Sequence, residues 1–161
     1  MRGMHVLSID GPGQGEMLKA GVFVTPDNHI IAAKAAYEFL AKQKSVDEKK
    51  IGICGRSFGT FWSMRAAAAE PRFAALAGAV ACYFWDNLSI FDEAPIRFKQ
   101  IFMEMSGTRS EEEFDAMCQK LSLKSDIERI ICPTLMATGE FDPLSPLEDA
   151  DTIFDHLNVP K

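Results

Sequence analysis

The pentapeptide Gly55-Arg56-Ser57-Phe58-Gly59 constrains the fold of this chain more than any other stretch of its sequence. The apolar run 50–54 before it is typical of a buried strand, and the run 60–70 after it is typical of a helix. A serine at so sharp a strand-to-helix turn holds a strained backbone and directs its hydroxyl into a cleft. The residues two before and two after it must be small, because strand and helix pass close together there. The pattern predicts a nucleophile elbow with Ser57 as the candidate nucleophile.

Apolar periodicity divides the rest of the chain into alternating strands and helices. Buried strands are predicted over residues 5–9, 51–54, 75–84 and 131–138. Helices are predicted over residues 26–43, 58–69, 95–105, 110–121 and 147–157, with Thr25 capping the first and Ser110 beginning the fourth. Strands that alternate with helices of about ten residues or more indicate βαβ units. The predicted fold class is therefore α/β, with a mainly parallel sheet flanked by helices.

Three loops are expected at the carboxyl ends of these strands, where a parallel sheet places its chemistry: the elbow, Asp10–Glu16 and Gly139–Pro143. A serine hydroxyl needs a base to remove its proton, usually a histidine oriented by a carboxylate. Asp142 is the candidate carboxylate and Glu140 the weaker alternative. The Asp-Pro dipeptide leaves open that Asp142 only caps a turn. The backbone N–H of Phe58 would supply one oxyanion-hole donor.

A histidine for this site is missing from the pattern. His5 precedes a strand at the wrong end, and His29 lies in the first turn of a helix. His156 lies late in the final helix, far from the strand ends, whereas a base must come within hydrogen-bond reach of the hydroxyl. The catalytic histidine is therefore unassigned, and we expect the chain alone to turn over substrates poorly or not at all.

Composition limits the class of protein and its partners. With 161 residues, 47% apolar and 25% charged, the chain has the make-up of one globular domain. A net charge of −6 without basic clusters argues against nucleic acid or an anionic membrane as a partner. No apolar run reaches about 18 residues and no secretory signal is visible, which favours a cytoplasmic protein. Four cysteines without a C-x-x-C pair are interpreted as reduced thiols, and those in apolar stretches as buried: Cys54, Cys82 and Cys132.

The glycine-rich loop 11–15 fits a dinucleotide site poorly. Glu16 stands where that fingerprint requires its third glycine, Pro12 stiffens the turn, and no helix is expected to start directly there. The lysine of a phosphate-binding P-loop is also missing. We therefore predict no cofactor and no metal site.

Four stretches together resemble the α/β-hydrolase fold: residues 10–16, 55–59, 69–75 and 132–142. Within that superfamily they are similar to the branch of the 2,6-dihydroxypseudooxynicotine hydrolases, the FrsA-type esterases and the fungal polyketide-shortening hydrolases. The resemblance extends over nearly the whole chain. It implies an enzyme that cleaves an ester, or a carbon–carbon bond next to a ketone, in a small-molecule substrate, with serine, acid and histidine and without a cofactor.

The same resemblance assigns roles to residues of this chain. Ser57 matches the nucleophile, Phe58 an oxyanion donor and Asp142 the acid, and residues 85–123 match a cap inserted after a strand. It also implies one incomplete domain, residues 1–161, that lacks strands upstream and a last strand with its histidine downstream. Members of the branch include dimers, so a homo-oligomer is compatible with the resemblance.

The strand order of that fold, 1-2-4-3-5-6-7-8, has a consequence for the first predicted strand. A strand that this chain lacks would lie between residues 6–9 and 51–54, so a gap of about 9–10 Å, twice the interstrand distance, is expected there. A catalytically inactive remnant or interaction module of the same fold is the alternative to an enzyme. A fold does not guarantee its chemistry, and exposed sheet edges favour association with another chain.

Overall fold

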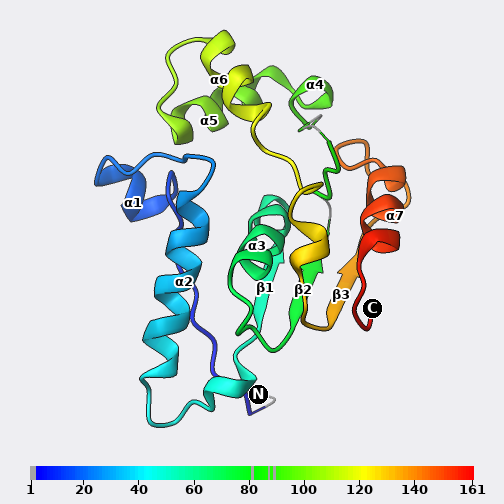
Figure 1. Ribbon diagram of the computed structural model, residues 1–161. Helices are drawn as coiled ribbons and strands as arrows, with labels where there is room; N and C mark the ends of the chain where they lie inside the picture. The colour runs from blue at the N-terminus through cyan, green and yellow to red at the C-terminus, as the bar shows by residue number, and fades with distance from the viewer. Residues whose placement is uncertain (1–2, 81, 87, 89) are drawn as a thin grey trace.

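A parallel β-sheet organises the fold. The computed structural model describes residues 3–80, 82–86, 88 and 90–161. Within these residues the sheet has three parallel strands in the order β1 (Ile53–Arg56), β2 (Leu76–Ala79) and β3 (Thr134–Ala137). Their carboxyl ends point the same way (Figure 1). The predicted parallel α/β sheet is confirmed.

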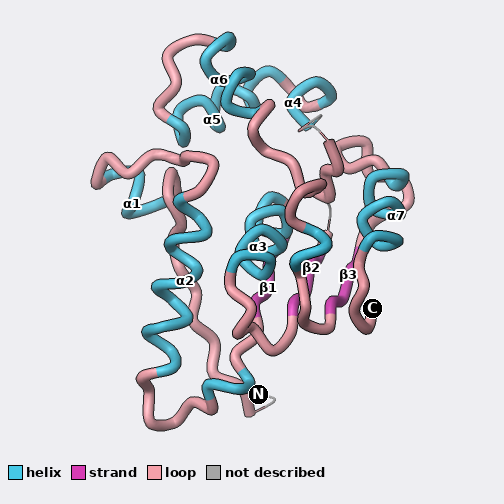
Figure 2. The backbone as a smooth tube through the Cα atoms, viewed as in Figure 1, coloured by secondary structure: helices cyan, strands magenta, loops and turns pink. Residues whose placement is uncertain are grey.

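Helices fill the connections between the strands and surround the sheet (Figure 2). They are α1 (Gly15–Lys19), α2 (Asn28–Ala41), α3 (Phe58–Ala69), α4 (Ile90–Glu93), α5 (Ile96–Ser106), α6 (Glu111–Cys118) and α7 (Leu147–His156), with short 3-10 turns η1 (Glu48–Lys50) and η2 (Ile127–Arg129). Helix α3 has the predicted bounds. The other predicted helices are each shorter than expected or shifted by a residue or more. Among the described residues, no helix combines the length and the apolar character needed to cross a bilayer.

Local hydrogen bonds explain where several helices begin. Thr25 and Asn28 bond each other's backbone: the Asn28 N–H donates to Thr25 Oγ1 (3.3 Å) and the Thr25 N–H to Asn28 Oδ1 (2.9 Å). The Ser110 hydroxyl accepts from the Glu113 N–H (3.2 Å) and so caps α6 as predicted. Helix α5 ends at Gly107 in the left-handed conformation (φ 68°).

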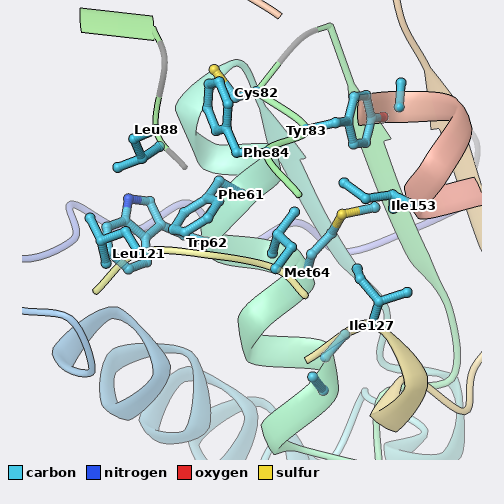
Figure 3. Packing of buried hydrophobic residues seen from close by; sticks show 14 of the residues in the cluster. Phe61, Trp62, Met64, Cys82, Tyr83, Phe84, Leu88, Leu121, Ile127 and Ile153 are labelled. Carbon is cyan, nitrogen blue, oxygen red and sulfur yellow. The ribbon is translucent and has the colours of Figure 1, made fainter. Parts of the chain in front are cut away.

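The core lies around α3, which packs on β1 and β2. Phe61, Met64 and their neighbours on α3 are fully buried and meet side chains from the segments that follow β2 and β3. Figure 3 shows Met64 of α3 close to Ile127, with Ile153 of α7 and Tyr83 beyond it. Burial of these large apolar side chains fixes α3, and with it the turn at its start, against the sheet.

The first predicted strand is absent, and that prediction was wrong. Residues 5–9 have no strand partner, and Val6 is 87% exposed. Segment 3–9 runs beside α2, away from the sheet (Figure 1). A cavity of about 1440 Å³ is lined by this segment and by residues 51–56, and no hydrogen bond joins segment 3–9 to β1 among the described residues. The segment stays exposed because no neighbouring strand satisfies its backbone or covers its side chains.

The face of β1 opposite α3 explains a second correction. Cys54, expected to be buried, is exposed, because alternate residues of β1 face away from α3 toward this cavity. Cys82 and Cys132 are buried as predicted.

Two backbone features differ from expectation near the strand ends. Strand β2 stops at Ala79 rather than continuing to residue 84, because Val80 (φ 62°) and Cys82 (φ 63°) adopt left-handed backbone angles that no strand accommodates. Residue 81 of the predicted strand lies outside the described residues.

A short helix, α1, does begin inside the glycine-rich loop, at Gly15. With 5 residues it is too short to resemble the helix of a dinucleotide-binding unit.

Residues 85–123, the segment expected to form a cap, contain α4, α5 and α6. These helices lie beyond the carboxyl ends of the strands (Figure 1). The backbone N–H of Val24 donates to the Met105 carbonyl (2.9 Å) and so joins the loop after α1 to the end of α5. The ring of Phe102 in α5 lies 5.0 Å from that of Phe58, so the helical segment lies beside the first turn of α3.

Candidate active site

Ser57 occupies a strained turn between β1 and α3. Its backbone angles (φ 52°, ψ −128°) lie in a region that residues other than glycine seldom adopt. The Ser57 N–H donates to the Ala79 carbonyl (3.1 Å), which extends the β1–β2 ladder by one residue. Thr60 adds support, since its hydroxyl lies 3.3 Å from the Gly55 carbonyl and 3.2 Å from that of Ala79. The side chain of Ser57 is exposed.

The two elbow glycines differ in the space that a side chain would find at each position. A Cβ on Gly55 would overlap the Gly59 carbonyl oxygen and approach Ser63 Oγ to 2.5 Å. A Cβ on Gly59 would meet no atom within 4 Å. Close passage of strand and helix therefore requires glycine only at position 55, and the expectation that both positions must be small was wrong for Gly59.

The Ser57 hydroxyl contacts the thiol of Cys82, with Oγ and Sγ 4.0 Å apart. Cys82 is 1% exposed. Burial, with a smaller contribution from the negative charge of Asp142, raises the pKa of its thiol to about 11, although the hydrogen bond to Ser57 opposes this shift. The thiol is therefore neutral at neutral pH and cannot act as the base for Ser57.

Asp142 lies in the loop after β3, on the same side as Cys82. Its Oδ1 accepts from the Leu144 N–H (3.0 Å), and its carbonyl accepts from the Ser145 N–H (3.3 Å), so Asp142 does cap a turn. The buried Ser145 hydroxyl accepts from the Tyr83 N–H (3.4 Å) and ties this loop to the segment after β2. The charge of Asp142 acts on the Cys82 thiol, which also lies 4.0 Å from Ser57 Oγ, so the structure places both the serine and the acid near this thiol.

Phe58 begins α3, where the first backbone N–H groups of a helix have no acceptor within the helix. Its ring points into a group of aromatic side chains, with centroids 5.0 Å from Phe102 and 6.4 Å from Phe91. Phe58 thus connects the turn that carries Ser57 to the helices between β2 and β3.

None of the three histidines joins this site through a hydrogen bond to Ser57 or Asp142 in the part of the chain that the structure describes. His5 is exposed in segment 3–9. His156 is exposed at the end of α7, where Nδ1 lies 2.8 Å from the Thr152 carbonyl and the ring is 4.4 Å from that of Trp85.

His29 is closer to the elbow than its place in a helical first turn suggested. Its ring stacks on Trp62 of α3 at 4.3 Å and 13°. Burial lowers the pKa of His29 to about 4, although a hydrogen bond to the backbone of Pro12 acts in the other direction by favouring the charged form. The neutral ring donates from Nδ1 to Pro12, because Nε2 is buried without a partner among the described residues. The one sequence signal is Gly11, since a Cβ there would overlap the His29 ring.

The glycine-rich loop and the elbow meet between two cavities. Gln14, Gly59 and Trp62 line both the large cavity beside β1 and a second cavity of about 50 Å³ beneath the helical segment 90–121. No group of three or more His, Cys, Asp or Glu side chains in the described part of the chain is placed to hold a metal ion.

Comparison with known proteins identifies the family to which this chain belongs. Residues 1–161 match the model of the prolyl oligopeptidase family. The chain is 30% identical over 168 residues to 2,6-dihydropseudooxynicotine hydrolase of Paenarthrobacter nicotinovorans, covering 98% of this chain and 43% of the relative. It is 31% identical over 200 residues to hydrolase LUC6 of a Fusarium species, covering 98% of this chain and 46% of that relative.

Solved structures give the same result for the fold. A crystal structure of 2,6-dihydroxy-pseudo-oxynicotine hydrolase matches with a TM-score of 0.78 and 29% identity, over 93% of this chain and 43% of the other. The structure of AbyA5 matches with a TM-score of 0.74 at 18% identity, over 92% and 44%. The sheet and its helices are therefore part of an α/β-hydrolase fold, and the chain spans less than half the length of these relatives.

Proposed function

Because this chain belongs to the prolyl oligopeptidase family, whose fold is that of the α/β-hydrolases, we propose that it carries the nucleophile and the acid of a serine hydrolase. The proposed substrate is a small molecule with an ester, or with a carbon–carbon bond next to a ketone. Two named relatives are hydrolases, which supports the reaction class. The observation that carries the proposal is the place of Ser57, which is exposed on a turn with φ 52°. Its hydroxyl contacts the Cys82 thiol, on which the charge of Asp142 also acts.

In the proposed reaction the Ser57 oxygen attacks the substrate carbonyl, and its proton passes to a base. The new C–O bond leaves a negative charge on the former carbonyl oxygen, which the Phe58 N–H stabilises. Collapse of this intermediate breaks the bond to the alkoxide of an ester or to the carbanion of a ketone fragment, and the leaving group takes up the proton that the base received from Ser57. Water then attacks the acyl group bound to Ser57, which releases the acid and restores the serine hydroxyl. Asp142 would orient the protonated base. Since no described histidine contacts Ser57 or Asp142, we propose that the chain alone reacts slowly.

A fluorophosphonate probe followed by peptide mass spectrometry tests this proposal. We expect label on Ser57, none in Ser57→Ala, and none on Ser63, a buried hydroxyl one turn further along α3. No label on Ser57 under conditions that label a known serine hydrolase would contradict the proposal. Rapid hydrolysis of p-nitrophenyl esters, lost in Ser57→Ala, would support the serine mechanism and overturn the expected low activity.

One observation favours a second candidate, an interaction module. The outer edge of β1 and segment 3–9 face the cavity of about 1440 Å³ with unpaired backbone, and Val6 and Ile9 are exposed beside it. Such edges pair readily with another strand, here that of a second copy of the chain. Sedimentation over a range of concentrations should then show dimers that Val6→Lys with Ile9→Lys abolishes, whereas a monomer at all concentrations would reject self-association.

A further inference from the structure

The smaller cavity, of about 50 Å³, lies between the first turn of α3 and the helical segment 90–121. Well-packed protein interiors contain few voids larger than a water molecule. This one adjoins the residue that follows the candidate nucleophile, since Phe58 and Gly59 line it. Figure 3 shows two more of its walls, Trp62 and Leu121, lying side by side. The cavity therefore lies next to the residue that follows the proposed nucleophile.

Aromatic rings fix the shape of this cavity. Phe91 lies edge-on to Phe102 (5.0 Å between ring centroids) and to Phe114 (4.9 Å), and Phe102 lies edge-on to Phe58 (5.0 Å). Such edge-to-face pairs hold rings in defined orientations. Met105 and Met117 complete the wall, and their flexible side chains can adjust to an occupant.

Two polar side-chain oxygens in the lining already have hydrogen-bond partners. Gln14 Oε1 accepts from the Gly11 N–H (3.1 Å). The Ser106 hydroxyl donates to the Met103 carbonyl (2.9 Å) and lies 3.0 Å from the Thr108 hydroxyl. No charged side chain is among the residues that line the cavity. A stable buried water needs two to four polar partners, so this lining suits an alkyl group better than water.

The volume of the cavity also limits which group it can hold. A water-sized group needs about 10–15 Å³ on this measure, so 50 Å³ holds about three to five methylene or methyl groups. A cavity known to admit benzene is larger, at roughly 150 Å³. The space therefore suits a short alkyl chain and excludes an aromatic ring.

We propose that this cavity binds the alkyl end of the substrate, a chain of about three to five carbon atoms attached to the carbonyl that Ser57 attacks. The proposal rests on the proposed function, because it places the reacting carbonyl at the elbow. It names the substrate class as short-chain aliphatic acyl compounds.

Alkyl fluorophosphonates from methyl to octyl test the proposal by their rates of labelling at Ser57. Each buried methylene contributes about 0.8 kcal/mol, so we expect the rate to rise about fourfold per carbon up to three to five carbons and then to level off or fall. Val24→Leu and, independently, Leu121→Phe add volume to the lining and should shift the optimum to shorter chains. Ile131→Phe, on an exposed residue outside the lining, should leave the optimum in place.

A binding measurement separates this proposal from the proposed function. In chain labelled with ¹³C-methyl methionine, 1-butanol and 1-pentanol should shift the NMR signals of Met105 and Met117, and cyclohexanol should not. Such shifts without any labelling of Ser57 would support the cavity and contradict the serine mechanism. Labelling with equal rates across the series would overturn the cavity proposal alone. Absence of both the shifts and the chain-length dependence would also overturn it.

Discussion

The two sides of β1 differ in how tightly other parts of the chain pack against them. On one side β1 pairs with β2 and is covered by α3, and Gly55 is buried against the backbone of that helix. On the other side the strand edge faces a cavity of about 1440 Å³, Cys54 is exposed, and segment 3–9 lies across the cavity without a strand partner. One strand thus separates a packed region from an open one.

This difference shows what the candidate site depends on. The unusual backbone of Ser57 persists because bonds to Ala79 and the hydroxyl of Thr60 hold the turn, and these lie on the packed side. The elbow therefore needs no contact from the open side to keep its shape. The open side instead determines which base or further segment can approach Ser57. The packed side should therefore lose far more stability on substitution than the open side.

The largest effect is expected at the buried ion pair that attaches α3 to η2. Arg65 Nε lies 2.9 Å from Asp126 Oδ2, with only 11% and 9% of the two side chains exposed. Asp126→Ala leaves the buried guanidinium with the Pro26 carbonyl and with Asp27, whose side chain is 79% exposed, so that no buried charge balances it. We expect a loss of about 3–5 kcal/mol in the free energy of unfolding, measured by urea denaturation.

A surface pair provides the control for Asp126. Glu16 and Lys19 form an ion pair at 3.1 Å with side chains 83% and 76% exposed. Glu16→Ala should cost no more than about 1 kcal/mol. If both variants lost the same small amount of unfolding free energy, the buried Arg65–Asp126 pair would not hold α3 against η2 as the structure indicates.

The next effect concerns the elbow glycines. Gly55→Ala should cost about 3 kcal/mol, because its Cβ would overlap the Gly59 carbonyl and neither backbone can move away. Gly59→Ala should be neutral or should stabilise by up to about 1 kcal/mol, since its Cβ meets open space within a helix. Thermal unfolding of the two single variants measures the difference. Equal losses would mean that strand and helix approach as closely at position 59 as at position 55.

Much of the packed side could be predicted from the sequence because its signals are local. The bounds of α3 follow from the elbow before it and the proline after it, and the cap at Ser110 depends on residues three apart. The parallel sheet follows from strands that alternate with helices. Ser57 and Asp142 could be chosen as candidates because their loops follow predicted strands, and their roles stay predictions.

The remaining features depend on contacts that no local pattern encodes. Residues 5–9 have the composition of a buried strand, yet burial requires a neighbouring strand, and none lies beside them. The left-handed backbone at Cys82 carries no sequence signal, because that conformation is rare for cysteine. The contact of His29 with Trp62 depends on how α2 docks against α3.

His29 lies where the packed and open sides meet, and its titration should make stability depend on pH. Burial lowers its pKa from 6.5 to about 4. The unfolded chain therefore binds more protons than the folded chain between these values, so stability is fully present above pH 6.5 and falls as the pH drops toward 4. We expect this group to remove about 2 kcal/mol between pH 7.5 and pH 5.

His29→Gln keeps an amide donor near Pro12 and removes the titration. Urea denaturation of both proteins across this pH range should show a shallower dependence in the variant, because the carboxylates common to both cancel in the comparison. Parallel curves for the two proteins would mean that His29 is solvated, and that the open cavity extends to its ring.

The smallest effect is expected on the open side, at Val6. Its side chain is 87% exposed, so Val6→Thr should change the free energy of unfolding by less than about 0.5 kcal/mol. Leu76→Ala, on a β2 residue that is 2% exposed, should cost about 2–5 kcal/mol and serves as the packed counterpart. A loss above 1 kcal/mol for Val6→Thr that grows with protein concentration would show that another copy covers this side in solution, because an exposed side chain in a monomer has little packing to lose.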